Sequence, residues 1–153
     1  MKRRLFMKGS LATGALGIAI STGLIPRTTL AAWSKDAFDA KDVNGALSGL
    51  FGSTDLTASD KIKIKAPDIA ENGAVVPVSV ETDIAGAQTI SIITEKNPTP
   101  LTASFDLGPG AEGYVSTRIK MGKTSSVIAV VKADGKLYSV GKEVKVTIGG
   151  CGG

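Results

Sequence analysis

Residues 60–148 restrict the possible folds because they repeat one pattern. Between residues 60 and 65, Ile62 and Ile64 alternate with three lysines, and this period of two indicates a strand with one buried face. Comparable segments follow at 74–82, 88–94, 101–107, 114–121, 126–133 and 136–148, the last divided near Gly141. No helical pattern intervenes, so the sequence predicts a mainly β chain, an antiparallel β-sandwich of immunoglobulin-like type.

Turn residues separate the predicted strands. Glu71-Asn72-Gly73 and Asp134-Gly135 are typical of tight turns, and residues 96–100 predict an extended connecting loop. Pro77 falls inside a strand segment and predicts an edge or a bulge there. The lysines at 61, 63 and 65 are interpreted as a solvated strand face and not as a ligand site.

A short helix is expected before the first strand. Ser34 is a candidate N-cap, and Gly52 would end the helix. Apolar residues follow helical spacing at Phe38, Val43, Ala46, Leu47 and Leu50. These apolar side chains are interpreted as packing residues.

Residues 1–32 form the layout of an export signal. Arg3 and Arg4 precede a moderately apolar, glycine-containing stretch and a small-residue segment that ends at Ala32. Paired arginines of this kind are typical of the twin-arginine export motif. The apolar stretch is shorter than the roughly 20 residues that span a bilayer, so cleavage after Ala31 or Ala32 is favoured over a retained anchor. We therefore expect a periplasmic protein with no membrane segment after cleavage.

The composition excludes many kinds of site. The chain has 153 residues, no histidine and one cysteine, which fits one domain, here residues 33–148. Histidine-dependent triads, His-ligated zinc and c-type haem attachment therefore lack their parts. We expect no catalytic residues, no metal and no bound cofactor.

The net charge of +4 does not indicate a nucleic-acid partner. Residues 1–32 carry five basic and no acidic residues, which leaves 13 basic and 14 acidic residues, a net charge of −1, in the remainder. A near-neutral body gives no electrostatic footprint for DNA or RNA.

The carboxyl terminus carries the only thiol. Cys151 lies between Gly149-Gly150 and Gly152-Gly153, directly after a clean alternating strand. Glycine-rich chain is slim and flexible, so residues 149–153 are predicted to form a flexible arm. Its extended length from Ile148 to Cys151 is about 10 Å. This pattern favours a thiol presented in turn to the pockets of other proteins, which would have to activate it.

Three segments carry a resemblance to a known family. The segments are 66–73 (APDIAENG) with the following 76–78 (VPV), 115–121 (VSTRIKM) and 144–153 (VKVTIGGCGG). With them the whole chain resembles SoxY, the sulfur-carrier subunit of the bacterial Sox thiosulfate-oxidising system. The resemblance implies an immunoglobulin-like sandwich, with Cys151 as the covalent attachment point for sulfur intermediates. It also implies a heterodimer with a second sandwich subunit, SoxZ, that lacks an export signal.

The resemblance implies further partners that act on the cysteine adduct. A c-type cytochrome, SoxAX, would couple thiosulfate oxidatively to Cys151, and a hydrolase, SoxB, would release sulfate. Where the host has one, a sulfane dehydrogenase would oxidise the remaining sulfur. The chain itself would bear the substrate and would not be an enzyme.

Two other classes remain open from the residues alone. The first is a structural or adhesion β-sandwich in which Cys151 links two copies through a disulfide, and such homodimers are also expected of an exposed carrier thiol. The second is a redox enzyme. That class normally needs a thiol of lowered pKa and a resolving partner, and neither is evident in the sequence.

Overall fold

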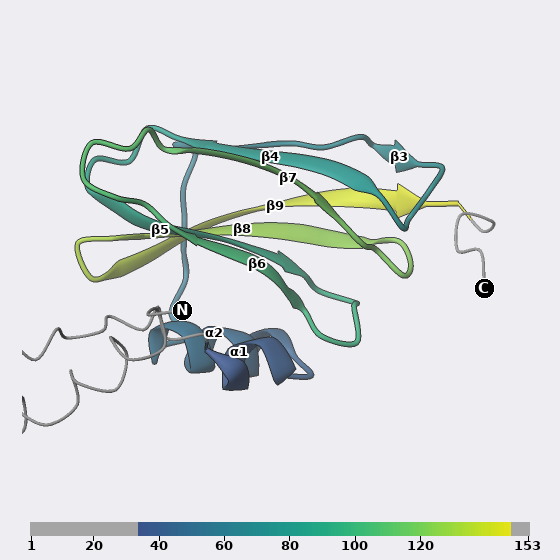
Figure 1. Ribbon diagram of the computed structural model, residues 1–153, viewed down its shortest axis with the longest axis horizontal. Helices are drawn as coiled ribbons and strands as arrows, with labels where there is room; N and C mark the ends of the chain where they lie inside the picture. The colour runs from purple at the N-terminus through teal and green to yellow at the C-terminus, as the bar shows by residue number, and fades with distance from the viewer. Residues whose placement is uncertain (1–33, 148–153) are drawn as a thin grey trace, which may run out of the picture. The chain divides into compact units, whose positions relative to one another are not determined.

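A computed structural model describes residues 34–147, and the statements below concern this part of the chain. Two sheets face each other, and a pair of helices lies beside one of them (Figure 1). In chain order the elements are α1 (Lys35–Asp39), α2 (Val43–Phe51), β1 (Thr57–Ala58), β2 (Ile62–Lys65), β3 (Ile69–Ala70), β4 (Val76–Thr82), β5 (Ala87–Thr94), β6 (Leu101–Asp106), β7 (Tyr114–Ile119), β8 (Ser125–Ala133) and β9 (Lys136–Val146). The prediction of a mainly β chain with a short helical segment first is confirmed.

The strand order is that of an immunoglobulin-like sandwich. The smaller sheet has the order β2-β4-β7, and the larger has the order β1-β9-β8-β5-β6, with β3 also paired to β9. Most neighbours are antiparallel, as expected. Two short strands differ, because β1 and β3 each pair with β9 in parallel. Both were missed in the sequence, where each spans only two residues.

Side chains between the two sheets form the main core. They come from alternating positions of the long strands, so each strand places one face inward. The fully or nearly fully buried members include Val76, Val78, Val80, Ile90, Ile92, Met121, Val127, Ala129, Val131 and Val144. This core joins β4 of the small sheet to β5, β8 and β9 of the large sheet.

A second core lies between the helices and the outer face of the large sheet. It contains Ala37, Ala46, Leu47, Ile93, Leu101, Val130 and Leu137. Leu47 is buried and Phe38 packs against this cluster, which confirms the interpretation of both as packing residues. Strand β5 is consequently buried on both faces along most of its length. No helix within residues 34–147 has the length and apolar character needed to cross a membrane.

The expected single helix is instead two helices. The chain leaves the helical conformation at Ala40 and begins again at Val43. Asp42 caps the second helix, since its carboxylate accepts a 2.7 Å hydrogen bond from the Gly45 N–H. Ser34 makes no side-chain cap and donates to the Gly49 carbonyl at 2.8 Å. The end at Gly52 is as predicted.

The strand boundaries follow the sequence pattern with one correction. Strand β9 runs unbroken through Gly141, where a division was expected, because an exposed glycine with ordinary φ keeps its pairing with Ile128. The Asp134-Gly135 turn is confirmed, with φ of 49° and 74°, the signature of a type I′ hairpin. Pro77 lies where β4 pairs with β7 alone, so the predicted edge is present locally.

Candidate functional site at the end of strand β9

The sequence-predicted site residues lie outside the described part of the chain. These are Cys151, the arm glycines Gly149, Gly150, Gly152 and Gly153, and the export residues Arg3 and Arg4. What the structure describes is the place from which the predicted arm departs. That place is Thr147, the residue after β9 and the last one described.

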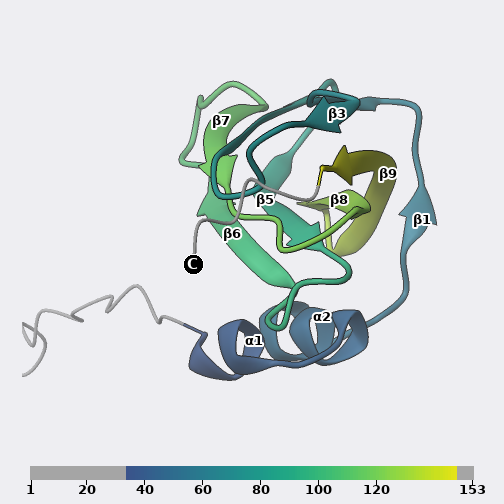
Figure 2. The same cartoon turned by 90° about the vertical axis from the view of Figure 1, so that its right-hand side faces the viewer.

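Strand β9 is the main support of this end. It is eleven residues long and pairs with β8 from Lys136 to Val144. Near its end, β3 lies beside it on the other edge (Figure 2). On one edge β8 therefore holds β9 as far as Val144, and on the other edge β3 holds Lys145 and Val146.

Strand β3 and its flanking residues hold the last part of β9 through three hydrogen bonds. The Lys145 N–H donates to the Asp68 carbonyl at 2.9 Å, and the Thr147 N–H donates to the Ala70 carbonyl at 3.1 Å. The Thr147 hydroxyl donates to the Glu71 carbonyl at 3.3 Å. Residues 66–71, which include β3, thus form a strap along the end of β9.

Two residues from other parts of the chain complete this support. The Val146 N–H donates to the Thr124 hydroxyl oxygen at 3.0 Å. Gly73 packs so tightly that an added Cβ would overlap the Met121 carbonyl oxygen and lie 2.8 Å from Val146 Cγ1. The predicted Asn72-Gly73 turn is present. Gly73 has no positive φ, so close packing, and not backbone conformation, explains why a glycine occupies this position.

A lysine of β9 fastens the start of the strap. The Lys142 ammonium donates to the Ala66 carbonyl at 2.6 Å and lies 3.0 Å from the Asp68 carboxylate. Its side chain is one-third exposed, and that of Asp68 is 89% exposed. The ion pair is thus solvated and weak by itself, whereas the bond to the carbonyl links β9 directly to residue 66.

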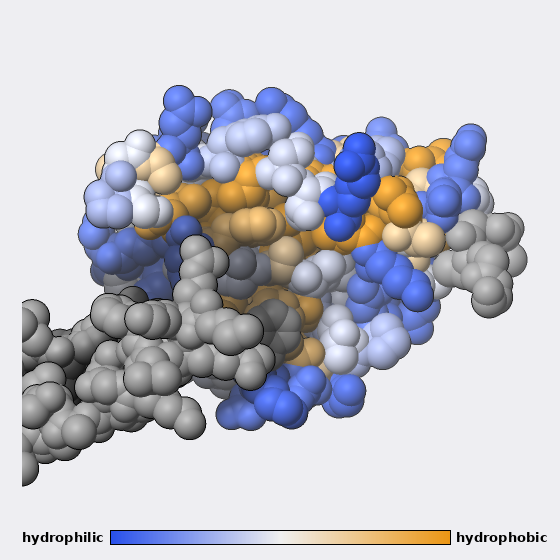
Figure 3. Space-filling view, viewed as in Figure 1, coloured by the Kyte–Doolittle hydropathy of each residue, from blue (hydrophilic) through white to orange (hydrophobic). Residues whose placement is uncertain are grey.

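Two exposed apolar side chains lie near the same end. Ile69 is 57% exposed and Val75 is 50% exposed, and only Tyr114 joins them as a large exposed apolar residue within residues 34–147. Ile69 is in register with Lys145, and Val75 is two residues beyond Gly73. Figure 3 shows apolar surface at this end of the molecule, next to charged surface.

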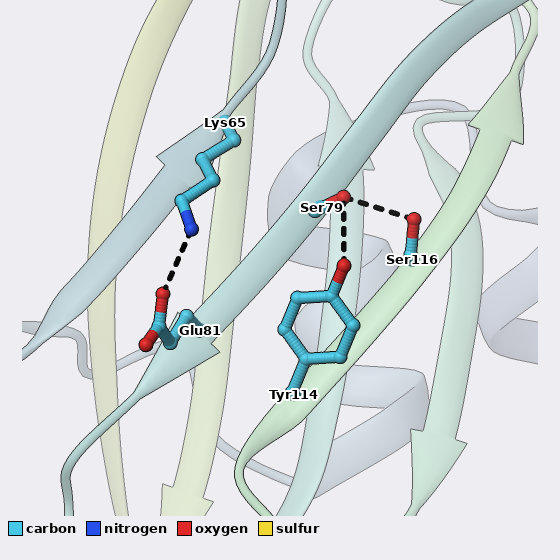
Figure 4. Close-up of polar contacts among 5 residues, drawn as sticks. All are labelled: Lys65, Ser79, Glu81, Tyr114 and Ser116. Carbon is cyan, nitrogen blue, oxygen red and sulfur yellow. Dashed lines mark hydrogen bonds and ion pairs between the residues drawn. The ribbon is translucent and has the colours of Figure 1, made fainter.

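The outer face of the small sheet is polar (Figure 4). Lys65 pairs with Glu81 at 3.1 Å, and the Ser79 and Ser116 hydroxyls lie 2.9 Å apart. The Tyr114 hydroxyl lies 3.5 Å from Ser79 Oγ, and hydrogen bonds with Ser79 and then Ser116 lower the pKa of Tyr114. The exposed lysines of β2 form a solvated face, as predicted.

No described residues form a metal site. Within residues 34–147, no group of three or more cysteine, aspartate or glutamate side chains is arranged to hold an ion.

Sequence reasoning missed the residues that hold the end of β9. Thr124 could not be recognised in the sequence, because threonine is common before a strand and its hydrogen-bond partner, Val146, lies 22 residues later. Gly73 was noticed, but as a turn residue. Within residues 66–73 the sequence predicted only the turn at 71–73 and a resemblance to a family, and it did not predict the pairing with β9.

The fold and the support of β9 define a class of small β-sandwich proteins in which the last strand is followed in the sequence by the cysteine. Comparison with known families gives the particular one: the family described as "Sulfur oxidation protein SoxY" matches residues 47–151. Since this match spans more than half of the chain, the protein belongs to the SoxY family. The matched range ends at Cys151.

A solved structure agrees with this assignment. The structure of the sulfur carrier protein SoxY from Chlorobium limicola f thiosulfatophilum is 52% identical, with a TM-score of 0.62, and the match covers 67% of this chain and 94% of that one. A crystal structure of an engineered protein matches at 16% identity and a TM-score of 0.39, over 57% of this chain and 20% of that one, too little to bear on fold or function. No curated protein matches the chain.

Proposed function

We propose that this protein is a periplasmic covalent sulfur carrier, with Cys151 as the attachment site. Membership of the SoxY family supports a sulfur-carrier role in sulfur oxidation. The observation that carries the proposal is the 52% identity to a sulfur carrier protein, together with a family match that extends to the only cysteine of the chain. The adjoining glycines 149, 150, 152 and 153 would form the flexible arm.

Loading forms a bond between two sulfur atoms. The Cys151 thiol loses its proton to solvent, and its sulfur bonds to the outer sulfur of thiosulfate. Two electrons leave the pair and pass to a c-type cytochrome of SoxAX type. The product is a cysteine S-thiosulfonate, which carries the terminal sulfonate at the end of the arm.

Unloading begins with hydrolysis. A SoxB-like hydrolase directs water to the terminal sulfonate sulfur, the sulfur–sulfur bond to that atom breaks, and sulfate leaves. The sulfane sulfur stays on Cys151 as a persulfide, for a sulfane dehydrogenase or another acceptor. The carrier supplies no acid or base to either step, so it acts as the substrate-bearing subunit and not as an enzyme, and it needs no cofactor of its own.

The proposal includes a partner subunit and an export route. Arg3 and Arg4 belong to a twin-arginine signal, a route that carries folded proteins. A SoxZ-like sandwich subunit without a signal would cross the membrane with this chain as a heterodimer. Family membership supports partners of the Sox system, and the particular subunits are proposed here.

Intact mass spectrometry of the periplasmic protein tests the proposal. Mass would be measured before and after reduction, and after exposure to thiosulfate with the natural partner proteins. Reducible sulfur adducts that map to Cys151, and that a Cys151→Ser variant never acquires, are expected. A bare thiol that gains no mass, or only a disulfide-linked homodimer, would instead favour a structural or adhesion sandwich.

A further inference from the structure

The exposed apolar residues near the arm are arranged unevenly over the molecule. Of the three large apolar side chains that are about half exposed within residues 34–147, Ile69 and Val75 lie at the end where β9 stops. Tyr114 starts β7 and pairs with Glu81, whereas the other end of β7 pairs with Val76. Tyr114 is therefore at the far end of the small sheet.

The length of the arm places this end against any enzyme that acts on the cysteine. Three residue-to-residue steps lead from Ile148 to Cys151, a reach of about 10 Å when fully extended. A pocket that encloses the Cys151 sulfur therefore brings its rim close to the body around Thr147. Ile69 is adjacent to this position, since the next residue, Ala70, accepts the hydrogen bond from the Thr147 N–H.

The described charges around this end are of both signs and include the exposed Lys123 beside Thr124, and the two exposed aliphatic side chains lie among them. Asp68 is paired with Lys142, so these two charges offset each other. Lys145 and Glu71 are exposed and of opposite sign. Two isolated aliphatic side chains make a small contact, which suits a partner that must bind and then release quickly.

We propose that Ile69 and Val75 contact the apolar rim of the pocket in enzymes that process the Cys151 adduct. The proposal rests on the proposed carrier function and adds a surface to it. The strap then has two roles, because it holds the end of β9 and also presents Ile69 beside the arm. Ile69 and Val75 act as docking residues and do not touch the reacting sulfur.

The test uses the full mature protein with its natural partner subunit. Tetrathionate loads the carrier without an enzyme, because the Cys151 thiolate takes up one thiosulfate half and releases the other as free thiosulfate. Sulfate release by the host's SoxB-like hydrolase is then measured against carrier concentration. The variant carries Ile69→Thr and Val75→Thr, which keep β-branched side chains and remove apolar surface.

The matched control is Tyr114→Thr, which removes an equally exposed apolar residue far from the arm. The double variant is expected to raise KM for the loaded carrier about fivefold, with kcat, melting temperature and the reaction of the free thiol with iodoacetamide unchanged. Tyr114→Thr should match the natural protein. Ile69→Leu with Val75→Ile should restore KM.

Three results would overturn the proposal. Unchanged KM in the double variant, with normal sulfate release, would refute the docking surface and leave the carrier function standing. An equal rise in KM for Tyr114→Thr would show that the effect is not local. No sulfate release from the loaded natural protein would refute the carrier function, and the docking surface with it.

Discussion

The backbone N–H of Val146 is bonded to the side chain of Thr124, at 3.0 Å, and not to another backbone group. Val146 is the last residue of β9 and comes after the final β8 pairing at Val144. Thr124 therefore takes the place of a strand partner on that edge of β9. It lets the strand stay ordered for two residues beyond its sheet neighbour.

Replacement of Thr124 by valine should loosen this end of the strand. Valine has nearly the same shape and no acceptor, so the Val146 N–H loses its partner. The free energy of unfolding should fall by about 1 kcal/mol, and hydrogen exchange at the Val146 amide should speed up more than at Val144. Thr124→Ser should restore slow exchange. Equal protection in Thr124→Val would show that the hydroxyl is dispensable.

Replacement of Gly73 by alanine should destabilise the fold through overpacking. The new Cβ would meet the Met121 carbonyl and Val146, and both belong to the packed end of the sandwich. A loss of about 1–3 kcal/mol in the free energy of unfolding is expected from urea titration. Gly122→Ala is the control, because its Cβ meets no atom within 4 Å. Similar stabilities for the two variants would contradict the packing argument.

Bulk in the arm should slow the carrier chemistry without altering the body. Valine at Gly150 and Gly152 widens the tail on both sides of Cys151. We expect slower loading by thiosulfate and slower sulfate release, at an unchanged melting temperature. Time-resolved intact mass spectrometry with the partner enzymes measures both rates. Normal rates in this variant would refute the requirement for a slim arm.

The two glycines of β9 and its turn should respond in opposite ways to alanine. Gly135 has φ of 74°, which an L side chain adopts at a cost of about 1 kcal/mol. Gly141 has ordinary φ and open space around it, so Gly141→Ala should be neutral or stabilise by up to about 1 kcal/mol. Thermal unfolding of the two variants makes the comparison. A Gly135→Ala variant that is more stable than the natural protein would show that a Cβ at this position causes no backbone strain in the turn.

Tyr114 should ionise below the usual tyrosine pKa. Its hydroxyl is hydrogen-bonded to Ser79 and Ser116, which lowers the pKa from 10.0. Ionised Tyr114 therefore favours the folded state, and this contribution is complete above the unfolded pKa and lost as the pH falls through the folded one. Ultraviolet titration in a Tyr138→Phe background should show the pKa rising when Ser79 becomes alanine. An unchanged pKa would exclude Ser79 as the cause.

Alternation along the chain was enough to predict the long strands. Inward residues such as Val76, Val78 and Val80 must repeat with period two, because the core accepts only one face of β4. The helix break was missed because Phe38, Val43 and Leu47 all pack on the same cluster despite it. The local signal was present in Asp42, a good N-cap residue three positions before Gly45.

The support of the candidate site was not predictable in the same way. Strand β3 has two residues, and its partner in β9 lies 76 positions later. Neither hydrophobic periodicity nor turn residues indicate a pairing between a two-residue strand and a segment so far away in the sequence. The thiol could be identified from composition alone, since Cys151 is the only cysteine. The residues that hold the end of β9 could not be identified in this way, because only tertiary contacts bring them together.

The pairing of β9 on both edges also determines how the protein bears mechanical load. A partner that bound the residues after Thr147, as proposed above, could pull along the axis of β9. A pull in this direction loads the hydrogen bonds to β8 together in shear, with those to β1 and β3 on the other edge. It does not peel them apart one at a time. The end of β9 can therefore bear tension along the strand while the sandwich stays folded.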